Sequence, residues 1–510
     1  MRTNKEIFKH LEELIIENES LRKENRQIKS ENSELRSEVK RLRKRIDEME
    51  TAMEERINKA VETAVAMATT VHQATVAEKN KEIQRLKAQI NKDSSNSSKP
   101  PGSNGYKKVQ NNREKSTRKQ GGQPGHPGTR FNIPNNLEEL VATGKAEHII
   151  ICNVPEGAPY VSDWTVDLKV TTVFTEHRRE PGKPQKIEYG AQIKSIAVYL
   201  CVIGLIAYKR LSQFFHEISH NIITVSKGSL AEFNRSAAGA VDLGPFIQGL
   251  LNGKVIHVDE TPIKTTERPN MEGLLETAEK TTFNAYIRTY SNSMTTVLTA
   301  NAYKTEKSVI ADNILTEFHG IVSQDHESKF YNFGNSNATC GAHLTRELKG
   351  MSELQMLKWA ADVRQFFLEM NKHKNNDVHN NKFSCEPILL RHFETCYDEF
   401  LQEGKQQLEI IPANTFGWDE LRRMVNRLEK HKDNYLLFIR DYDAPFTNNL
   451  AERDLRHCKT RQKVSGCFRT WLGVLDYCKI RSVLDTAKKR KQNLFNTLLS
   501  LFSKTDLAGQ

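Results

Sequence analysis

Apolar residues recur at every seventh position over the first fifty residues, and this repeat constrains the fold more than any other feature. The first series is Ile7, Leu14, Leu21, Ile28, Leu35, Leu42 and Met49. If these are heptad d positions, the a positions are Leu11, Asn18, Asn25, Asn32, Val39, Ile46 and Met53. Neither Pro nor Gly interrupts the repeat. A sustained seven-residue period predicts a left-handed coiled coil in this part of the chain.

The three successive Asn residues at a positions predict a paired, in-register assembly. A buried Asn costs stability but fixes the register of two helices. The register slips after Met53, where Arg56 takes the next d position, and a second apolar stripe then runs to Ile90. We therefore expect residues 1–92 to form a homodimer. The alternative is a solvated single helix held by charge pairs, which does not require an apolar residue at every seventh position.

The composition changes abruptly at residue 93. Residues 93–133 are rich in Ser, Asn, Gly and Pro, and residues 93–130 hold eight Lys or Arg against two acidic residues. Such a segment cannot bury a core, so it predicts a flexible basic linker. It is either a plain solvated spacer or an arm that follows a phosphate backbone. The net charge of the whole chain, +11, makes a polyanion the first partner to consider.

The next two segments predict small domains. Val166, Leu168 and Val170 alternate with polar residues, which indicates a strand in a β-rich module over 134–188. Residues 189–251 have helical spacing, with a break at 219–224 and Ser226 placed to cap a second helix. The pair of helices fits either a helix-turn-helix reader of DNA or an ordinary helical hairpin.

Two carboxylates follow apolar strand-like segments in the region 252–349. Residues 255–258 read as a buried strand ending in Asp259, and residues 321–324 as one ending in Asp325. Between them the pattern predicts strands at 283–290 and 294–300 and a helix at 305–318. If the two strands pair, both carboxylates project from one edge of the sheet. A lone Asp at a strand end is more often a turn former, but two such residues in this order favour a site for divalent cations.

A third acid is expected near Asn448-Asn449. The paired Asn can cap a helix, which places Glu452 in its first turn and Arg456 and Lys459 on the same face. A surface helix with i,i+4 ion pairs explains the spacing equally well. The competing acids in this region are Asp441, Asp443 and Asp454.

The chain resembles the DDE transposases of the bacterial insertion sequence 66 family. The zipper and several motifs carry the resemblance in order: SSKPPGSNG, GGQPGHPGTR, HVDETP, the Asp325 strand, Cys340-Gly-Ala-His343, NNLAERDLR and KVSGCFRT. The resemblance implies an α/β multidomain protein with an RNase H-like catalytic core over 252–349 and 441–510. It implies a helical insertion over 350–440, and Asp259, Asp325 and Glu452 as the catalytic, metal-binding triad for two Mg²⁺ or Mn²⁺ ions.

The implied activity is metal-dependent cleavage at transposon ends, followed by strand transfer of the 3′-hydroxyl into target double-stranded DNA. Accessory proteins encoded by the element are common in such systems. The residues we expect to contact DNA are His343, Arg346, Arg456, Lys459, Arg461, Lys463 and Arg469. The alternative is a non-catalytic DNA-binding dimer, either a decayed transposase or a repressor. The three intact acids favour the enzyme.

Family members commonly carry a Cys-rich zinc-binding module, and this chain departs from that pattern. Between the glycine-rich arm and the helical region only Cys152 occurs, with His148 and His177 nearby, too few for four ligands at ordinary spacing. We therefore expect a degenerate, zinc-free module. Cys340 and His343 form a C-x-x-H half-site without a second half. The eight Cys include no C-x-x-C pair, and no apolar run is long enough to span a bilayer, so a cytoplasmic protein is expected.

Overall fold

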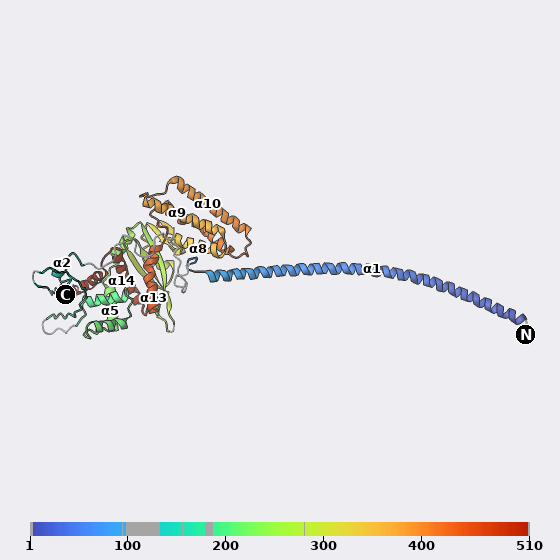
Figure 1. The fold of residues 1–510 in the computed structure, drawn as a ribbon, viewed down its shortest axis with the longest axis horizontal. Coiled ribbons are helices and arrows are strands. Elements are labelled where there is room, and N and C mark those ends of the chain that lie inside the picture. The colour runs from blue at the N-terminus through green and yellow to red at the C-terminus, as the bar shows by residue number, and fades with distance from the viewer. Residues whose placement is uncertain are drawn as a thin grey trace. The chain divides into compact units, whose positions relative to one another are not determined.

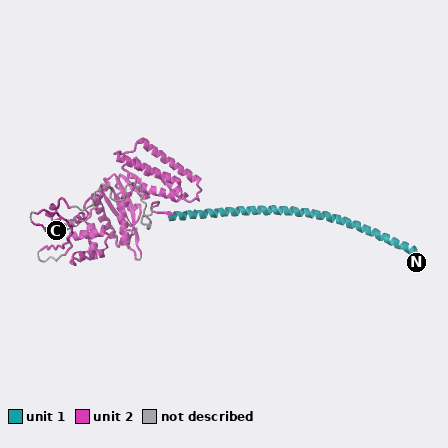
Figure 2. Cartoon of the chain, in the orientation of Figure 1, with its two compact units in different colours: residues 1–90 teal, residues 91–510 magenta. Residues whose placement is uncertain are grey.

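The computed structural model describes residues 4–93, 95–97, 133–151, 154–155, 158–178, 187–279 and 281–507, with side chains described as far as Ser503. The chain divides into two units, residues 1–90 and residues 91–510 (Figure 2). Within the described ranges, no helix is long and apolar enough to cross a membrane.

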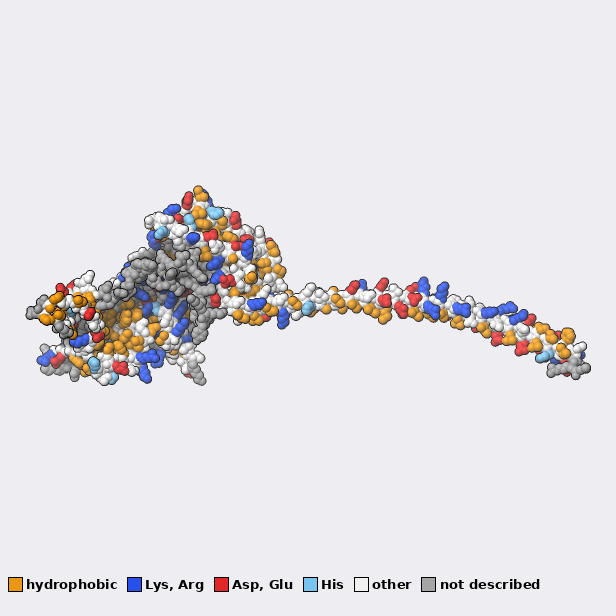
Figure 3. Space-filling model, in the orientation of Figure 1, with side chains coloured by type: hydrophobic (Ala, Val, Ile, Leu, Met, Phe, Trp, Pro, Cys, Tyr) orange, Lys and Arg blue, Asp and Glu red, His pale blue; other side chains and the backbone are white. Residues whose placement is uncertain are grey.

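The first unit is a single helix, α1 (Asn4–Asn91), as the heptad pattern predicts. None of its residues is buried, although its a and d positions are largely apolar. Leu21 is 54% exposed and Leu35 58% exposed. Figure 3 shows a band of hydrophobic side chains along one side of this helix.

The centre of the second unit is a five-stranded mixed sheet. Its strands are β1 (Val255–Thr265), β4 (Phe283–Ser291), β5 (Thr296–Asn301), β6 (Ile321–Gln324) and β7 (Ser336–Thr339). Their spatial order is β5-β4-β1-β6-β7. β4 pairs antiparallel with β1 and β5, whereas β6 pairs parallel with β1 and β7. A separate hairpin joins β2 (Glu267–Pro269) to β3 (Leu275–Thr277).

Each face of the sheet is buried beneath its own set of helices. On one face, Ile263 and Ile287 pack with helices α13 (Asn449–Ser465), α14 (Trp471–Lys489) and α15 (Leu494–Leu507). On the other, Ile256 and Val258 pack with Val309 of α7 (Glu306–Ala311) and with the segment that follows it. Because side chains alternate along a strand, Asp259 shares the face of Ile263, beneath α13. Figure 1 shows α13 and α14 beside the strands.

The helices before the sheet form where the pattern predicts them. They are α3 (Ala191–Val202), α4 (Tyr208–Ile218), α5 (Lys227–Gly239) and α6 (Gly244–Leu251). Ser226 caps α5, and its hydroxyl accepts a hydrogen bond from the Ser229 backbone N–H at 3.0 Å. Leu230 and Phe233 of α5 are buried in the same core as α3 and α14. This region therefore packs against the helices that cover the sheet.

Residues 350–440 are helical, as predicted. The helices are α8 (Gly341–Leu354), α9 (Lys358–His379), α10 (Pro387–Ile410), α11 (Trp418–Lys430) and α12 (Lys432–Arg440), and they share one core around Trp359. The Trp359 indole donates to the Phe400 carbonyl at 2.8 Å. On the sheet side, Asn434 of α12 donates to the Asn337 carbonyl of β7 at 3.1 Å. These helices are thus joined to the β7 edge.

Three expectations about local structure were wrong. The described residues of 134–188 contain one helix, α2 (Leu137–Ala142), and no strand. Val166 and Leu168 are exposed, and no neighbouring strand within the described ranges pairs with their backbone, which a stable strand requires. Helix α7 ends at Ala311 instead of 318, because Asn313 adopts a left-handed conformation with φ of 50°. β1 continues six residues past Asp259, to Thr265, because it keeps its pairing with β4.

The first residues of the segment predicted as a flexible linker are packed against α8. Asn96 is 7% exposed, and its side-chain amide donates to Glu353 at 3.3 Å. A Cβ on Gly350 would lie 2.3 Å from the Asn96 carbonyl oxygen, so this approach requires glycine. Residues 98–132, including the glycine-rich motif, lie outside the described residues.

The start of α8 leaves no room for a side chain at its first residue. The Gly341 N–H donates to the Phe446 carbonyl at 2.8 Å, and a Cβ on Gly341 would lie 2.3 Å from the Phe446 ring. We expect Gly341→Ala to destabilise the second unit by about 1–3 kcal/mol through overpacking, measured as a lower thermal midpoint. The matched control is Gly239→Ala in α5, where a Cβ meets no atom within 4 Å. Equal midpoints for the two variants would contradict this account.

Candidate active site

Parallel pairing of β1 with β6 brings the first two predicted acids together. His257 lies opposite Ser323 in this register. Asp259 lies two residues later within β1, and Asp325 lies two residues later, directly after the end of β6; the two strands run in the same direction. Burial first, and the negative charge of Asp325 second, raise the pKa of Asp259 above the ordinary carboxyl range. Two carboxylates held this close favour a cation between them.

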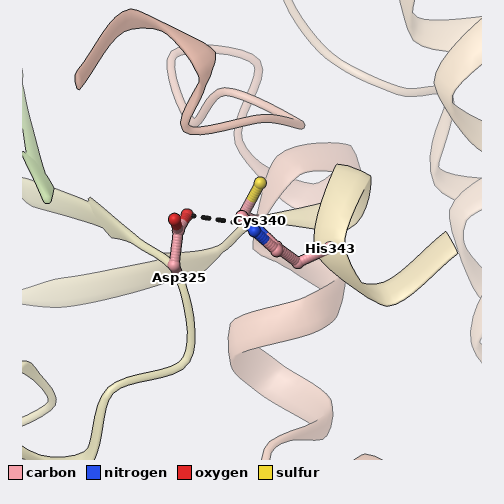
Figure 4. Close-up of side chains that lie close together, drawn as sticks. All are labelled: Asp325, Cys340 and His343. Carbon is pink, nitrogen blue, oxygen red and sulfur yellow. Dashed lines mark ion pairs between the residues drawn. The ribbon is translucent and has the colours of Figure 1, made fainter. Parts of the chain in front are cut away.

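His343 connects the second acid with the third. It lies in the first turn of α8, and Glu452 lies in the first turn of α13, as predicted. The His343 Nδ1 is 3.4 Å from Asp325 Oδ1 and 3.7 Å from Glu452 Oε1. Figure 4 shows the His343 ring pointing at the Asp325 carboxylate. One imidazole thus contacts carboxylates from two separate elements.

The charge on His343 follows from these contacts. Burial by itself would lower the pKa of His343, but interactions with Asp325 and Cys340 raise it to about 11. These contacts favour the protonated form of the ring. Its positive charge offsets part of the repulsion among the acids.

Two donor sets that suit different metals overlap here. Asp325, Cys340 and His343 bring one ligand atom each within 4.8 Å of one another. This oxygen, sulfur and nitrogen set has the chemistry of a zinc or other transition-metal site. The carboxylates of Asp259, Asp325 and Glu452 suit Mg²⁺ or Mn²⁺. Asp325 Oδ1 is buried and, apart from His343, has no partner in the described part of the chain, so an oxygen ligand is available.

Asn448 fixes α13 against the sheet. Its side-chain amide donates to the Val258 carbonyl at 2.8 Å, and its Oδ1 lies 3.1 Å from His257 Nδ1. Burial lowers the pKa of His257 to about 4, so the ring is neutral and its Nδ1–H can donate to that oxygen. The Asn448 backbone N–H also contacts the Cys340 sulfur at 3.2 Å. One buried residue thereby joins β1 immediately before Asp259 to the helix that carries Glu452.

Sequence reasoning did not find this role of Asn448. The paired Asn was expected to cap α13, and Asn448 does occupy the N-cap position. Its side chain, however, makes no capping hydrogen bond and turns to β1 instead. Two adjacent Asn residues signal a polar contact, but the partner is 190 residues away in the chain.

The structure separates Glu452 from the competing acids. Asp454 binds the hydroxyls of Ser291 and Thr296 and lies 2.6 Å from Lys489. Asp443 is exposed and pairs with Lys254 at 2.7 Å. Asp441 ends α12 and accepts the Asp443 backbone N–H at 2.8 Å. Of the four acids, only Glu452 contacts His343, so the geometry favours it as the third acid.

The residues expected to contact DNA fall into two groups. Arg456, Lys459 and Lys463 are exposed and share one stripe of α13 with Glu452, and Arg469 is exposed beyond its end. The positive charge of Lys459 is near enough to Asp259 to act to lower the pKa of Asp259, against the larger effects of burial and of Asp325. His343 and Arg346 of α8 are half-buried.

Arg461 faces another direction. Its guanidinium stacks over the Phe468 and Tyr477 rings, 4.8 and 4.5 Å from their centroids. These contacts pack Arg461 against α14 and away from the exposed stripe, and its contact with DNA stays a prediction.

The geometry defines an α/β protein with an acidic site at the centre of a mixed sheet. Comparison with protein families identifies it more closely: the model of the transposase IS66 family matches residues 186–474. The chain belongs to this family of transposases, which implies DNA binding and a role in transposition. A second model, a family of unknown function (DUF6444), matches residues 4–132. A search of curated proteins finds no match.

The Asn448 contacts predict a stability difference between adjacent residues. Asn448→Ala leaves the Val258 carbonyl and His257 without their partner, and removing a buried hydrogen-bond partner costs about 1–3 kcal/mol. We expect a clearly lower thermal midpoint for this variant. Asn449→Ala removes the same side chain from an exposed position and should change stability by no more than roughly 0.5 kcal/mol. Calorimetry of both variants tests the assignment, and an Asn448→Ala midpoint as high as that of Asn449→Ala would refute it.

Proposed function

We propose that the chain is a DDE transposase with Asp259, Asp325 and Glu452 as its catalytic triad. The observation that carries the proposal is that His343 contacts both Asp325 and Glu452, while the negative charges of Asp325 and Glu452 both act to raise the pKa of Asp259. The antiparallel and parallel halves of the sheet, in the order β5-β4-β1-β6-β7, support an RNase H-like core. Residues 350–440 would be a helical insertion in that core, and residues 441–510 would complete it.

The triad would hold two Mg²⁺ or Mn²⁺ ions. Bound divalent ions activate an attacking oxygen and stabilise the leaving oxygen of a phosphodiester. The other role of the chain's own residues is to position the three carboxylates. The parallel strands hold Asp259 and Asp325, Asn448 holds the helix that bears Glu452, and His343 orients two of the three carboxylates. The raised pKa of His343 makes it a poor proton donor at neutral pH, so we assign it to orientation.

The proposed reaction is cleavage at the element's ends and transfer of the freed 3′-hydroxyl into target DNA. The exposed stripe Arg456, Lys459 and Lys463, with Arg469, would neutralise the DNA backbone close to the acids. The helices over 189–251 and the basic segment 93–133 would add DNA contacts, and residues 1–92 would form the dimer.

The triad predicts a sharp loss of cleavage in Glu452→Gln. We expect nicking of a labelled duplex carrying the end of its own element, in Mg²⁺ or Mn²⁺, to fall at least about 100-fold, because one oxygen ligand loses its charge. The matched control is Asp443→Asn, which removes an equal charge from the exposed acid paired with Lys254. It should retain activity. Tight binding without any nick in the unsubstituted protein would favour the non-catalytic dimer.

The basic stripe predicts a change in salt dependence. Lys459→Gln combined with Lys463→Gln should weaken binding to all duplexes and reduce the slope of log K against log salt by roughly one for each phosphate that is no longer neutralised. Fluorescence anisotropy across a salt series measures this. Lys405→Gln, in α10 of the insertion and paired with Glu429, is the control and should leave the slope unchanged. An unaltered slope in the double variant would remove these residues from the DNA surface.

A further inference from the structure

The exposed apolar band of α1 has charged residues along both of its edges. In the heptad frame set by Leu21 and Asn25, the g positions flank one side of the band and the e positions flank the other. The g positions are Glu17, Glu24, Glu31, Glu38 and Arg45. The e positions five residues later are Arg22, Lys29, Arg36, Arg43 and Glu50.

In a parallel, in-register pair of helices, each g residue faces the e residue five positions later on the partner. Every one of these five contacts then joins opposite charges: Glu17 to Arg22, Glu24 to Lys29, Glu31 to Arg36, Glu38 to Arg43 and Arg45 to Glu50. The last contact is the most informative. In this pair the g residue is basic and the e residue is acidic, the reverse of the other four pairs. The two facing charges are nevertheless still opposite.

An antiparallel pair would instead bring g against g and e against e. Over residues 22–38 that arrangement places glutamates against glutamates, Arg against Arg and Lys29 against its own copy. A staggered parallel pair would lose the matching of Asn18, Asn25 and Asn32 at the a positions. Both alternatives put like charges or unmatched polar groups at the interface, which disfavours them.

We propose that α1 binds a second copy of this chain as a parallel, in-register, two-stranded coiled coil whose direction is set by these e and g charges. Apolar residues at d, with Val39 and Ile46 at a, suit a dimer. Both copies of Asn91 would then lie at the same end of the coiled coil, so both catalytic units would be tethered there. That two such units serve two DNA ends rests on the proposed transposase function. The proposed orientation of the helices does not depend on that function.

Cysteine cross-linking in the full chain tests the direction of the helices. Leu14→Cys should form an intermolecular disulfide in most molecules, because a parallel register places the two d positions side by side. An antiparallel pairing of residues 7–53 would put Leu14 opposite Ile46 and the two copies of Leu14 roughly 50 Å apart. Cross-linking that occurs only in a mixture of Leu14→Cys and Ile46→Cys chains would overturn the proposal. The unsubstituted chain controls for its own cysteines.

Charge reversal tests the cause. The four substitutions Glu17→Lys, Glu24→Lys, Glu31→Lys and Glu38→Lys should weaken the dimer at least roughly tenfold, measured by sedimentation equilibrium. Mixing this variant with a chain carrying Arg22→Glu, Lys29→Glu, Arg36→Glu and Arg43→Glu should restore a heterodimer.

The matched control reverses four glutamates outside the interface, at b and c positions, with the same change of net charge: Glu12→Lys, Glu19→Lys, Glu34→Lys and Glu48→Lys. It should remain as dimeric as the unsubstituted chain. Equal weakening in the control, or a monomer or trimer in the unsubstituted chain, would refute the proposal. DNA nicking measured on the same preparations reports separately on the triad.

Discussion

Parallel pairing between β1 and β6 is the constraint on which the site depends. Parallel neighbours point the same way, so residues at equal distances along them emerge at one place. Asp259 and Asp325 occupy such positions, two residues past the His257–Ser323 pair. β6 is only four residues long and all four are buried, so its position is fixed by packing on both faces. A shift of one residue would move Asp325 to the opposite face of the sheet.

The opposite face of β1 carries a buried ionic network that fixes the register of β1 against β4. Glu260, next to Asp259, lies opposite Arg288 of β4, and the two side chains are 2.7 Å apart with no exposed surface. Arg288 also contacts Asp312, and Lys329 reaches Glu260 at 2.9 Å. Buried ion pairs contribute little net stability, but breaking one leaves an uncompensated charge. The network therefore contributes more to fixing the strand register than to the stability of the fold.

The position of α13 against the sheet depends on contacts between distant parts of the chain. Between β7 and α13 the chain forms helices α8 to α12, and it returns to the sheet at Phe446 and Asn448. The Gly341–Phe446 and Asn448–Val258 hydrogen bonds secure that return. These helices can therefore fold around their own core at Trp359 while Glu452 still lies within reach of His343. His343 is positioned by the same junction, because α8 begins there.

The sequence alone determined the features that arise from local periodicity and composition. These include the long α1 helix, the helices over 350–440, the strands of 252–349 and the choice of Asp259 and Asp325 as paired acids. It could not predict that Val166 and Leu168 lack a strand partner among the described residues, because alternation does not supply one. Nor could spacing alone choose between Glu452 and its neighbouring acids; only the resemblance to the family singled out Glu452. The contacts of His343 with Asp325 and Glu452, and the contact from Asn448 to β1, depend on packing between residues far apart in the chain, which only the tertiary structure decides.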